Sequence, residues 1–394
     1  MYYPRRILPL LKKQLSTKEI VVLTGMRRTG KTTLYRMIFD EIKSENKAFL
    51  DIENPIEQKI FEEKDFRNIW ANLKAYQIAP EKKAYLFLDE IQAYPPIVKA
   101  IKYLYDHYQI KFFLTGSSSY YLKNLFPESL AGRKLTFELN PLDFSEFLIF
   151  KGTVKTFHPG FKQMSFQKNL VMHEKVKKLY AEYLSDGGFP EVVLEKNKQQ
   201  RQYKLLDIFK SYFEKDVRLL SDFRNISRFR DLILLLMQRV GSKLEIAKLS
   251  SELGLSRDTI YSYLTFLEGT YFIHLIEPFS RSVDREVSGT KKIYFCDTGL
   301  VNHLAQISGG ALLENAVFNN LKKYGQQINY YQKRSGAEID FVIDKKIAIE
   351  VKQKASIQVL KRLATTAKQL RISEYYLATH DFSDLDRSIP VTEI

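Results

Sequence analysis

The sequence predicts a multidomain α/β protein whose first domain is a parallel sheet built around a phosphate-binding loop. Two observations carry this prediction. The pattern G-x-x-x-x-G-K-[ST] begins at residue 25, between an apolar stretch and a helical one. A later pair of strand-like stretches, residues 337–343 and 347–352, carries an Asp and a Glu-x-Lys. At 394 residues the chain is long enough for several domains.

The loop has the flanking elements that phosphate binding requires. Residues 19–24 read as a short buried strand, and residues 32–43 place apolar side chains at helical spacing. Glycines let the backbone wrap around phosphates, and the helix N-terminus presents free N–H groups. We expect Lys31 to reach the β- and γ-phosphates of ATP and Thr32 to hold Mg²⁺. The residues predicted to bind the nucleotide here are Gly25, Met26, Arg27, Arg28, Thr29, Gly30, Lys31, Thr32 and Thr33.

A second predicted strand covers residues 47–53, and a helical stretch runs to about residue 76. The next apolar strand, residues 84–90, ends in two acids, Asp89 and Glu90. Parallel strands deliver their last residues to the sheet edge where phosphates bind. Asp89 is predicted to bind the metal, and Glu90 to orient and polarise the attacking water.

Residues 111–119 predict a further strand with a polar end. Thr115 or Ser117 would contact the γ-phosphate or the water, although these hydroxyls would also suit a helix cap. Arg133 stands before another predicted strand, residues 135–139. An arginine from the same or a neighbouring subunit would stabilise the developing charge on the γ-phosphate.

Residues 1–145 resemble the AAA+-like P-loop ATPases, specifically a large prokaryotic family with a C-terminal region of unknown function. The segments that carry the resemblance are residues 25–33, 88–92, 114–118, 130–133 and 140–148. The resemblance implies that Arg133 is the arginine finger. It would act within its own subunit or, in a homo-oligomer, in trans.

Composition narrows the class of protein. The chain is 45% apolar and 27% charged, its longest aliphatic run is only residues 232–237, and no signal peptide is visible, which predicts a cytoplasmic protein without a membrane partner. A single cysteine, Cys296, excludes a disulfide framework. The net charge of +15 is spread along the chain, so it leaves both a nucleic-acid partner and a generally basic surface open.

The middle of the chain is predicted to be helical. Residues 146–216 form helices broken at residues 186–191, and residues 244–267 show a helix-turn-helix pattern followed by a wing-like strand at residues 272–277. Residues 217–287 contain 10 Lys and Arg residues against 9 Asp and Glu residues, which is a weak footprint for DNA. DNA binding and interdomain packing therefore both remain open for this winged helix.

The C-terminal strands place four charged side chains on one face. If the hairpin is centred on Lys345, Asp340 faces Glu350, and Glu338 faces Lys352. Such a cluster suits a Mg²⁺-dependent phosphodiester hydrolase. It resembles the PD-(D/E)xK nuclease superfamily, and this resemblance implies a restriction-endonuclease-like domain with Glu314, Asp340 and Glu350 as metal ligands. Asp340, Glu350 and Lys352 would be catalytic. The alternative is an inactive scaffold in which Glu338 and Lys352 form an ordinary ion pair.

We therefore expect four parts: an AAA+-like P-loop ATPase domain (1–145), a helical lid or linker (146–216), a winged helix-turn-helix (217–287) and a nuclease-like domain (288–394). The predicted function is an ATP-binding, Mg²⁺-dependent ATPase coupled to a DNA-interacting C-terminal region, with cleavage of DNA by that region left open. The alternative is an ATP-driven switch that acts on a protein partner.

Overall fold

The computed structural model describes residues 2–116, 130, 132–217, 226–280, 286, 289–325, 327–333 and 336–394. The chain divides into two compact units. One comprises residues 1–140 and the short stretch Gly269–Tyr271, and the other comprises Pro141–Glu268 and Phe272–Ile394.

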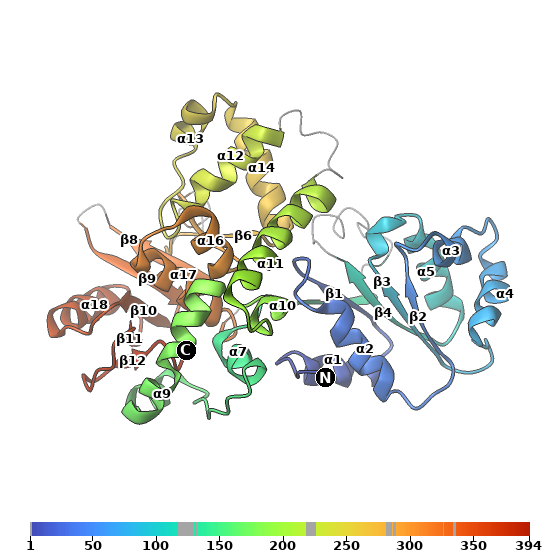
Figure 1. The fold of residues 1–394 in the computed structure, drawn as a ribbon, viewed down its shortest axis with the longest axis horizontal. Helices are drawn as coiled ribbons and strands as arrows, with labels where there is room; N and C mark the ends of the chain where they lie inside the picture. Colours follow the sequence, from blue (N-terminus) through green and yellow to red (C-terminus); the bar gives the residue numbers. More distant parts are fainter. Residues whose placement is uncertain are drawn as a thin grey trace. The chain divides into compact units, whose positions relative to one another are not determined.

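The first unit contains a five-stranded parallel sheet in the order β2-β3-β4-β1-β5 (Figure 1). Its five strands were all predicted, and they are β1 (Ile20–Thr24), β2 (Lys47–Asp51), β3 (Ala84–Asp89), β4 (Ile110–Gly116) and β5 (Lys134–Glu138). The helices are α1 (Leu8–Lys13), α2 (Lys31–Glu41), α3 (Pro55–Gln58), α4 (Ile69–Leu73) and α5 (Ile97–His107). The helical stretch predicted up to residue 76 is split into α3, α4 and single 3₁₀ turns.

Both faces of this sheet are covered, as a parallel sheet requires. Successive residues of β1 point to opposite faces. Ile20 and Val22 pack in the cluster that contains α4 and α5, whereas Val21 and Leu23 pack with α1 and α2. This three-layer arrangement explains why β1 reads as an unbroken apolar run.

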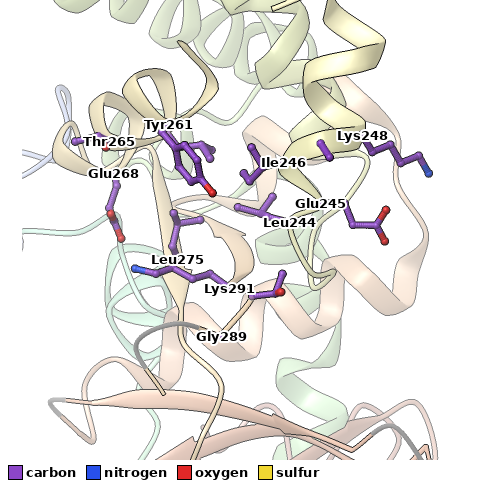
Figure 2. Close-up of a pocket in the computed structure, with 13 residues that line it drawn as sticks. Leu244, Glu245, Ile246, Lys248, Tyr261, Thr265, Glu268, Leu275, Gly289 and Lys291 are labelled. Atoms are coloured by element: carbon purple, nitrogen blue, oxygen red, sulfur yellow. The ribbon is translucent and has the colours of Figure 1, made fainter. Parts of the chain in front are cut away.

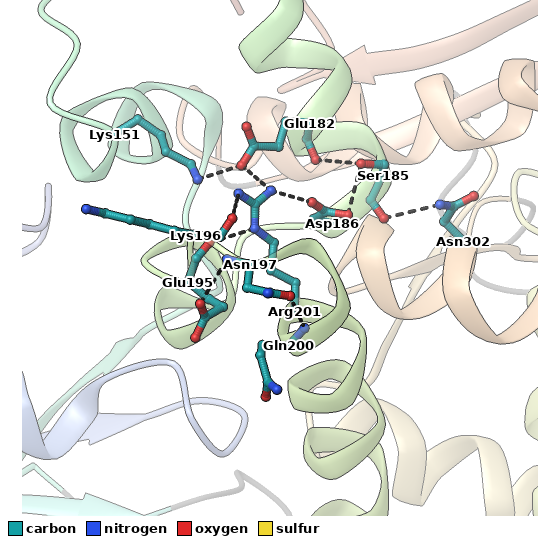
Figure 3. A network of polar contacts seen from close by, with 10 residues as sticks. All are labelled: Lys151, Glu182, Ser185, Asp186, Glu195, Lys196, Asn197, Gln200, Arg201 and Asn302. Atoms are coloured by element: carbon teal, nitrogen blue, oxygen red, sulfur yellow. Dashed lines mark hydrogen bonds and ion pairs between the residues drawn. The ribbon is translucent and has the colours of Figure 1, made fainter.

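The second unit begins with helices: α7 (Phe144–Phe150), α8 (Phe161–Phe166), α9 (Leu170–Asp186), α10 (Pro190–Val193) and α11 (Lys198–Ser211). The predicted break falls between α9 and α10, where Gly187 has a φ of 77°. The side chain of Arg201 joins these helices, because its guanidinium lies 2.6 Å from Glu182 and 2.8 Å from Asp186 on α9 (Figure 3). Lys151 also reaches Glu182, at 2.5 Å.

Three helices and a two-stranded sheet follow: α12 (Ile226–Met237), α13 (Ile246–Leu253), α14 (Arg257–Gly269), β6 (Ile273–Ile276) and β7 (Lys292–Phe295). Gly254, with a φ of 63°, forms the turn after α13, and the hydroxyl of Ser256 caps α14 by accepting from the Thr259 N–H at 3.1 Å. β6 and β7 are antiparallel, and Lys243 forms an isolated bridge with Lys292. This small sheet crosses the boundary predicted at residue 287.

The remaining elements are α16 (Thr298–Ala305), α17 (Gly309–Leu321), β8 (Ile328–Gln332), β9 (Glu338–Ile343), β10 (Ile347–Lys352), α18 (Ile357–Gln369), β11 (Glu374–Thr379) and β12 (Ser388–Pro390). They build a mixed sheet in the order β12-β11-β10-β9-β8, in which β8, β9 and β10 are antiparallel neighbours and β10, β11 and β12 are parallel. α18 packs on this sheet through Leu363 and Ala367. Together, these elements form the frame around the C-terminal acids.

Candidate functional site

The phosphate-binding loop lies between β1 and α2, as predicted. Gly25 has a φ of 144°, and a Cβ there would lie 2.2 Å from the Leu139 carbonyl oxygen. Gly30 has a φ of 95° just before α2 begins. A side chain at position 25 would therefore clash with the backbone of Leu139. A side chain at position 30 is strongly disfavoured by the backbone geometry.

Lys31 is held against this loop. Its ammonium donates hydrogen bonds to the carbonyls of Gly25 at 2.8 Å and Met26 at 3.0 Å, and its residue is only 4% exposed. Arg5 supports the loop from behind by donating to the Thr29 carbonyl at 2.9 Å. The positive charge thus stands inside the loop.

The first helical turn and the end of β3 meet at one point. The Thr32 hydroxyl donates to Oδ2 of Asp89 at 2.8 Å. Burial raises the pKa of Asp89, and hydrogen bonds from Thr115 and Thr32 oppose that rise. A hydroxyl beside a carboxylate is an oxygen donor set suited to Mg²⁺, so these two residues fit the predicted metal.

Thr115 completes this edge of the sheet from the end of β4. Its buried hydroxyl donates to Asp89 Oδ1 and accepts from the backbone N–H of Glu90 at 2.9 Å. Glu90 itself has a φ of 52°, and its carboxylate accepts from the Gln92 amide. Of the two hydroxyls considered, Thr115 is thus placed beside both acids, and Ser117 lies outside the described residues.

Arg133 lies at the opposite edge of the sheet. Its carbonyl accepts from the N–H of Ile20, the first residue of β1, whereas the loop follows Thr24, the last. A five-residue strand spans about 16 Å. The guanidinium Nε is 3.0 Å from Asp106 Oδ1 at this amino edge. The side chain is therefore directed away from the loop of its own chain.

The C-terminal acids come together from three elements. The pairing of Ile347 with Ile343 and of Ile349 with Phe341 confirms the hairpin centred on Lys345. Lys352 Nζ lies 2.8 Å from Glu350 and 3.8 Å from Asp340.

Glu314 of α17 belongs to the same cluster. Burial and, to a smaller extent, the charge of Asp340 raise the pKa of Glu314 to about 7 and that of Glu350 to about 7. Oε2 of Glu350 is buried without a hydrogen-bond partner. The three carboxyl groups are thus mutually repulsive when ionised.

β7 adds two side chains that the sequence analysis missed. Lys292 Nζ is 2.7 Å from Glu338 and 3.8 Å from Glu314, and the Tyr294 hydroxyl donates to Glu314 at 2.6 Å. The ion pair between Glu338 and Lys352, which the alternative of an inactive scaffold predicted, is not formed. Glu338 pairs with Lys292 instead, and Lys352 pairs with Glu350. No spacing pattern in the sequence signals these contacts, because Tyr294 and Glu314 are 20 residues apart and Lys292 and Glu338 are 46 residues apart.

Two lysine ammonium groups, those of Lys292 and Lys352, lie close to the acids of this cluster. Across the described ranges, no group of three or more His, Cys, Asp or Glu side chains is arranged to hold a metal ion. Lys292 and Lys352 supply the neutralising charge instead. Glu314, Asp340 and Glu350, the predicted metal ligands, thus lie among amino groups that already pair with acids of the cluster.

α13 and α14, the helices of the predicted helix-turn-helix, border a pocket of about 780 Å³ (Figure 2). Leu244 and Leu264 contribute apolar walls, and Tyr261 and Lys291 contribute polar ones. Tyr261, predicted to lie on the recognition helix, is 56% exposed.

Comparison with known proteins identifies the class of the chain. Residues 17–148 match the family described as an AAA domain, residues 177–310 match a domain of unknown function (DUF8612), and residues 309–390 match another (DUF4143). The Walker-type ATPase PABY2304 of Pyrococcus abyssi has a similar fold, with a TM-score of 0.50 and 16% identity over 77% of this chain and 96% of that one. The AAA domain, together with the loop and the parallel sheet, supports ATP binding and ATPase activity.

Relatives then place the chain within a family. An uncharacterized protein of Methanocaldococcus jannaschii is 30% identical over 380 residues, which is 93% of this chain and 80% of the relative. An uncharacterized protein of Haemophilus influenzae is 28% identical over 342 residues, 84% of this chain and 80% of the relative. The chain belongs to the P-loop ATPase family that includes the Methanocaldococcus protein. Among the helices that the structure describes, none has the length and apolar character of a membrane span.

Proposed function

We propose that the chain is a Mg²⁺-dependent ATPase whose nucleotide cycle controls its C-terminal region. The observation that carries this proposal is the 2.8 Å hydrogen bond between Thr32 and Asp89, which joins the loop to the acidic strand end. Thr32 and Asp89 would hold the metal, which screens phosphate charge when bound. Lys31 would bind the phosphates, and Glu90 would polarise the attacking water.

Substitution of Glu90 tests this assignment. Glu90→Gln should retain nucleotide binding, measured with a fluorescent ATP analogue, and should lower the turnover of ATP by about 100-fold because general-base assistance is lost. The matched control is Glu81→Gln on the exposed surface of the same unit. Wild-type turnover in Glu90→Gln would exclude the proposed role.

We further propose that Arg133 acts in trans, in a homo-oligomer. Its position at the amino edge of the sheet supports this, because it points away from the loop of its own chain. Mixing inactive Arg133→Ala with inactive Lys31→Ala should restore turnover, since mixed assemblies contain sites with both intact groups. Failure of every mixing ratio to restore turnover would contradict action in trans.

For residues 217–287 we propose a winged helix. The order α12, α13, α14, β6, together with the ribbon that β6 forms with β7 and the bridge of Lys243 to Lys292, supports this fold. For residues 288–394 we propose a nuclease-like domain, supported by the order α17, β8, β9, β10, α18, β11 and by the acids at β9 and β10. The linker 146–216 would connect this output to the ATPase domain 1–145.

Two functions of the output region are favoured by different observations. Lys352 beside Asp340 and Glu350 favours phosphodiester cleavage, in which the lysine would stabilise developing charge. The neutralisation of the acids by Lys292 and Lys352 favours an inactive scaffold in a switch that acts on a protein partner.

Nicking of plasmid DNA with Mg²⁺ or Mn²⁺ distinguishes these two functions. Cleavage that disappears in Asp340→Ala supports the nuclease, with Glu314, Asp340 and Glu350 as ligands once the amines move aside. Intact DNA in the wild type, with ATP turnover unaffected by added DNA, supports the protein switch.

A further inference from the structure

A groove of about 750 Å³ runs between α18 and the strands that carry the acid cluster. Its walls include Lys333 after β8, Lys361 and Arg362 on α18, and Lys352 at the end of β10. Two acids, Glu338 and Glu350, also line it. The groove therefore connects an exposed basic helix face with the cluster described above.

The sign of the charge in this groove is set by three cations. Glu338 is already paired with Lys292 at 2.7 Å, and Glu350 with Lys352 at 2.8 Å. Lys333, Lys361 and Arg362 are exposed, and none of them forms an ion pair with a residue of the described ranges. A concave surface lined by charges of one sign raises the local concentration of ions of the opposite sign. Three such cations around one groove therefore attract an anion.

The cations come from three separate elements, which favours an extended anion over a small one. Lys361 and Arg362 lie on α18, Lys333 directly follows β8, and Lys352 ends β10, 2.8 Å from Glu350. A single phosphate would contact only part of this set, whereas a sugar–phosphate chain presents one negative charge at each nucleotide along its path.

We propose that this groove binds the backbone of DNA through Lys333, Lys361 and Arg362, so that one phosphodiester lies beside Lys352. The inference rests on the proposed DNA-directed function of the C-terminal region and assigns its binding surface. Direct base contacts are not required, because phosphate contacts by lysine and arginine position a nucleic acid without reading its sequence. The near-neutral winged helix would then not be the main source of affinity.

The test measures binding without cleavage. The full-length chain is titrated against a fluorescein-labelled 24-base-pair duplex in EDTA, and anisotropy is recorded at several salt concentrations. Lys361→Gln with Arg362→Gln should weaken binding about 10-fold or more and should reduce the slope of log K against log salt by about 2, since two phosphate contacts are lost.

The matched control is Lys368→Gln with Arg371→Gln. Lys368 lies in the last turn of the same helix and Arg371 lies two residues beyond its end, and both line a different hollow. Equal losses in both pairs, or no loss in either, would overturn the groove as the binding surface. Thermal unfolding of both variants verifies that the fold is retained.

Two further arms separate this inference from the proposed activities. Groove-dependent binding with no nicking in Mg²⁺ or Mn²⁺ would reject the nuclease and retain the groove. Nicking that is unchanged by Lys361→Gln with Arg362→Gln would reject the groove and retain the nuclease. A polyglutamate peptide that binds more tightly than the duplex, with the same dependence on Lys361 and Arg362, would identify an acidic protein partner and overturn the proposal for DNA.

Discussion

The nucleotide site and the acid cluster differ in which groups stabilise their charged side chains. In the first unit, the ammonium of Lys31 is solvated by two carbonyls of its own loop. In the second, carboxyl groups from separate elements repel one another and are countered by Lys292 and Lys352. A contiguous motif can therefore stabilise its charge with groups from its own loop. The charges of a site built from separate elements are balanced only when all of these elements are in place.

The two sites also differ in what holds them. Thr32 in the first turn of α2, Asp89 at the end of β3 and Thr115 near the end of the neighbouring β4 are linked by hydrogen bonds. The acid cluster joins a mixed sheet, α17 and a strand of the small β6–β7 sheet. Disturbing one partner should therefore affect function first in the nucleotide site and local stability first in the acid cluster.

The largest effect is expected at the loop. Lys31→Ala should lower ATP turnover by about 1000-fold, because the charge that faces the phosphates is removed. Phosphate release under saturating ATP measures it. Lys64→Ala, an exposed lysine of the same unit, should leave turnover unchanged. Normal hydrolysis in Lys31→Ala would show that this ammonium does not act on the phosphates.

Removing a cation from the acid cluster should act on stability. Lys292→Met leaves Glu338 and Glu314 without their shared partner, which should cost about 3 kcal/mol of local stability. Amide hydrogen exchange in β7 and β9 should become about 100-fold faster. Lys291→Met is the neighbouring control, since its ion pair with Glu277 is partly exposed, whereas Lys292 is buried. Equal exchange in both variants would show that the cluster does not depend on β7.

The raised pKa of Glu350 predicts a dependence of stability on pH. Burial raises this pKa to about 7 from the ordinary 4.5, so the folded protein keeps a proton that the unfolded chain releases within this window. Stability should therefore fall as pH rises from 4.5 to 7. Glu350→Gln should remove about 1 to 3 kcal/mol of that fall.

Calorimetry in EDTA at both ends of the window measures the pH effect. The control is Glu174→Gln on α9, whose side chain is 55% exposed. A stability that falls with pH equally in Glu350→Gln and the wild type would mean that this carboxyl is not the source of the dependence.

The smallest effect concerns the hydroxyl of Thr115. Thr115→Val keeps the shape of the side chain but removes its bonds to Asp89 and to the N–H of Glu90. We expect kcat to fall about 10-fold with KM unchanged, because the acids lose their orientation while the loop is intact. Steady-state kinetics measure both constants. Thr136→Val on exposed β5 should change neither.

Much of the nucleotide site could be predicted because its signals are local. Gly25 and Gly30 indicate positive φ angles that other residues rarely adopt, and Asp89 ends an apolar strand. The sequence leaves the choice between Thr115 and Ser117 open, since alternation along a strand places residues two apart on the same face and does not decide which hydroxyl meets the acids. Only the packed sheet places Thr115 there.

The acid cluster was predicted in part. The hairpin register followed from alternation about Lys345, so Asp340 and Glu350 were assigned to one face. Lys292 and Tyr294 were missed because their contacts with Glu338 and Glu314 are long-range and carry no spacing pattern.

From the sequence by itself came the P-loop, the five strands around it, and the C-terminal hairpin with its acids, because each is encoded in neighbouring residues whose geometry is largely local. Only the tertiary structure decided that Arg133 stands at the edge of the sheet opposite the loop, that β7 completes the acid cluster, and that Lys333, Lys361 and Arg362 share a groove. These outcomes depend on how distant segments pack, and packing selects among partners that periodicity and charge leave equivalent.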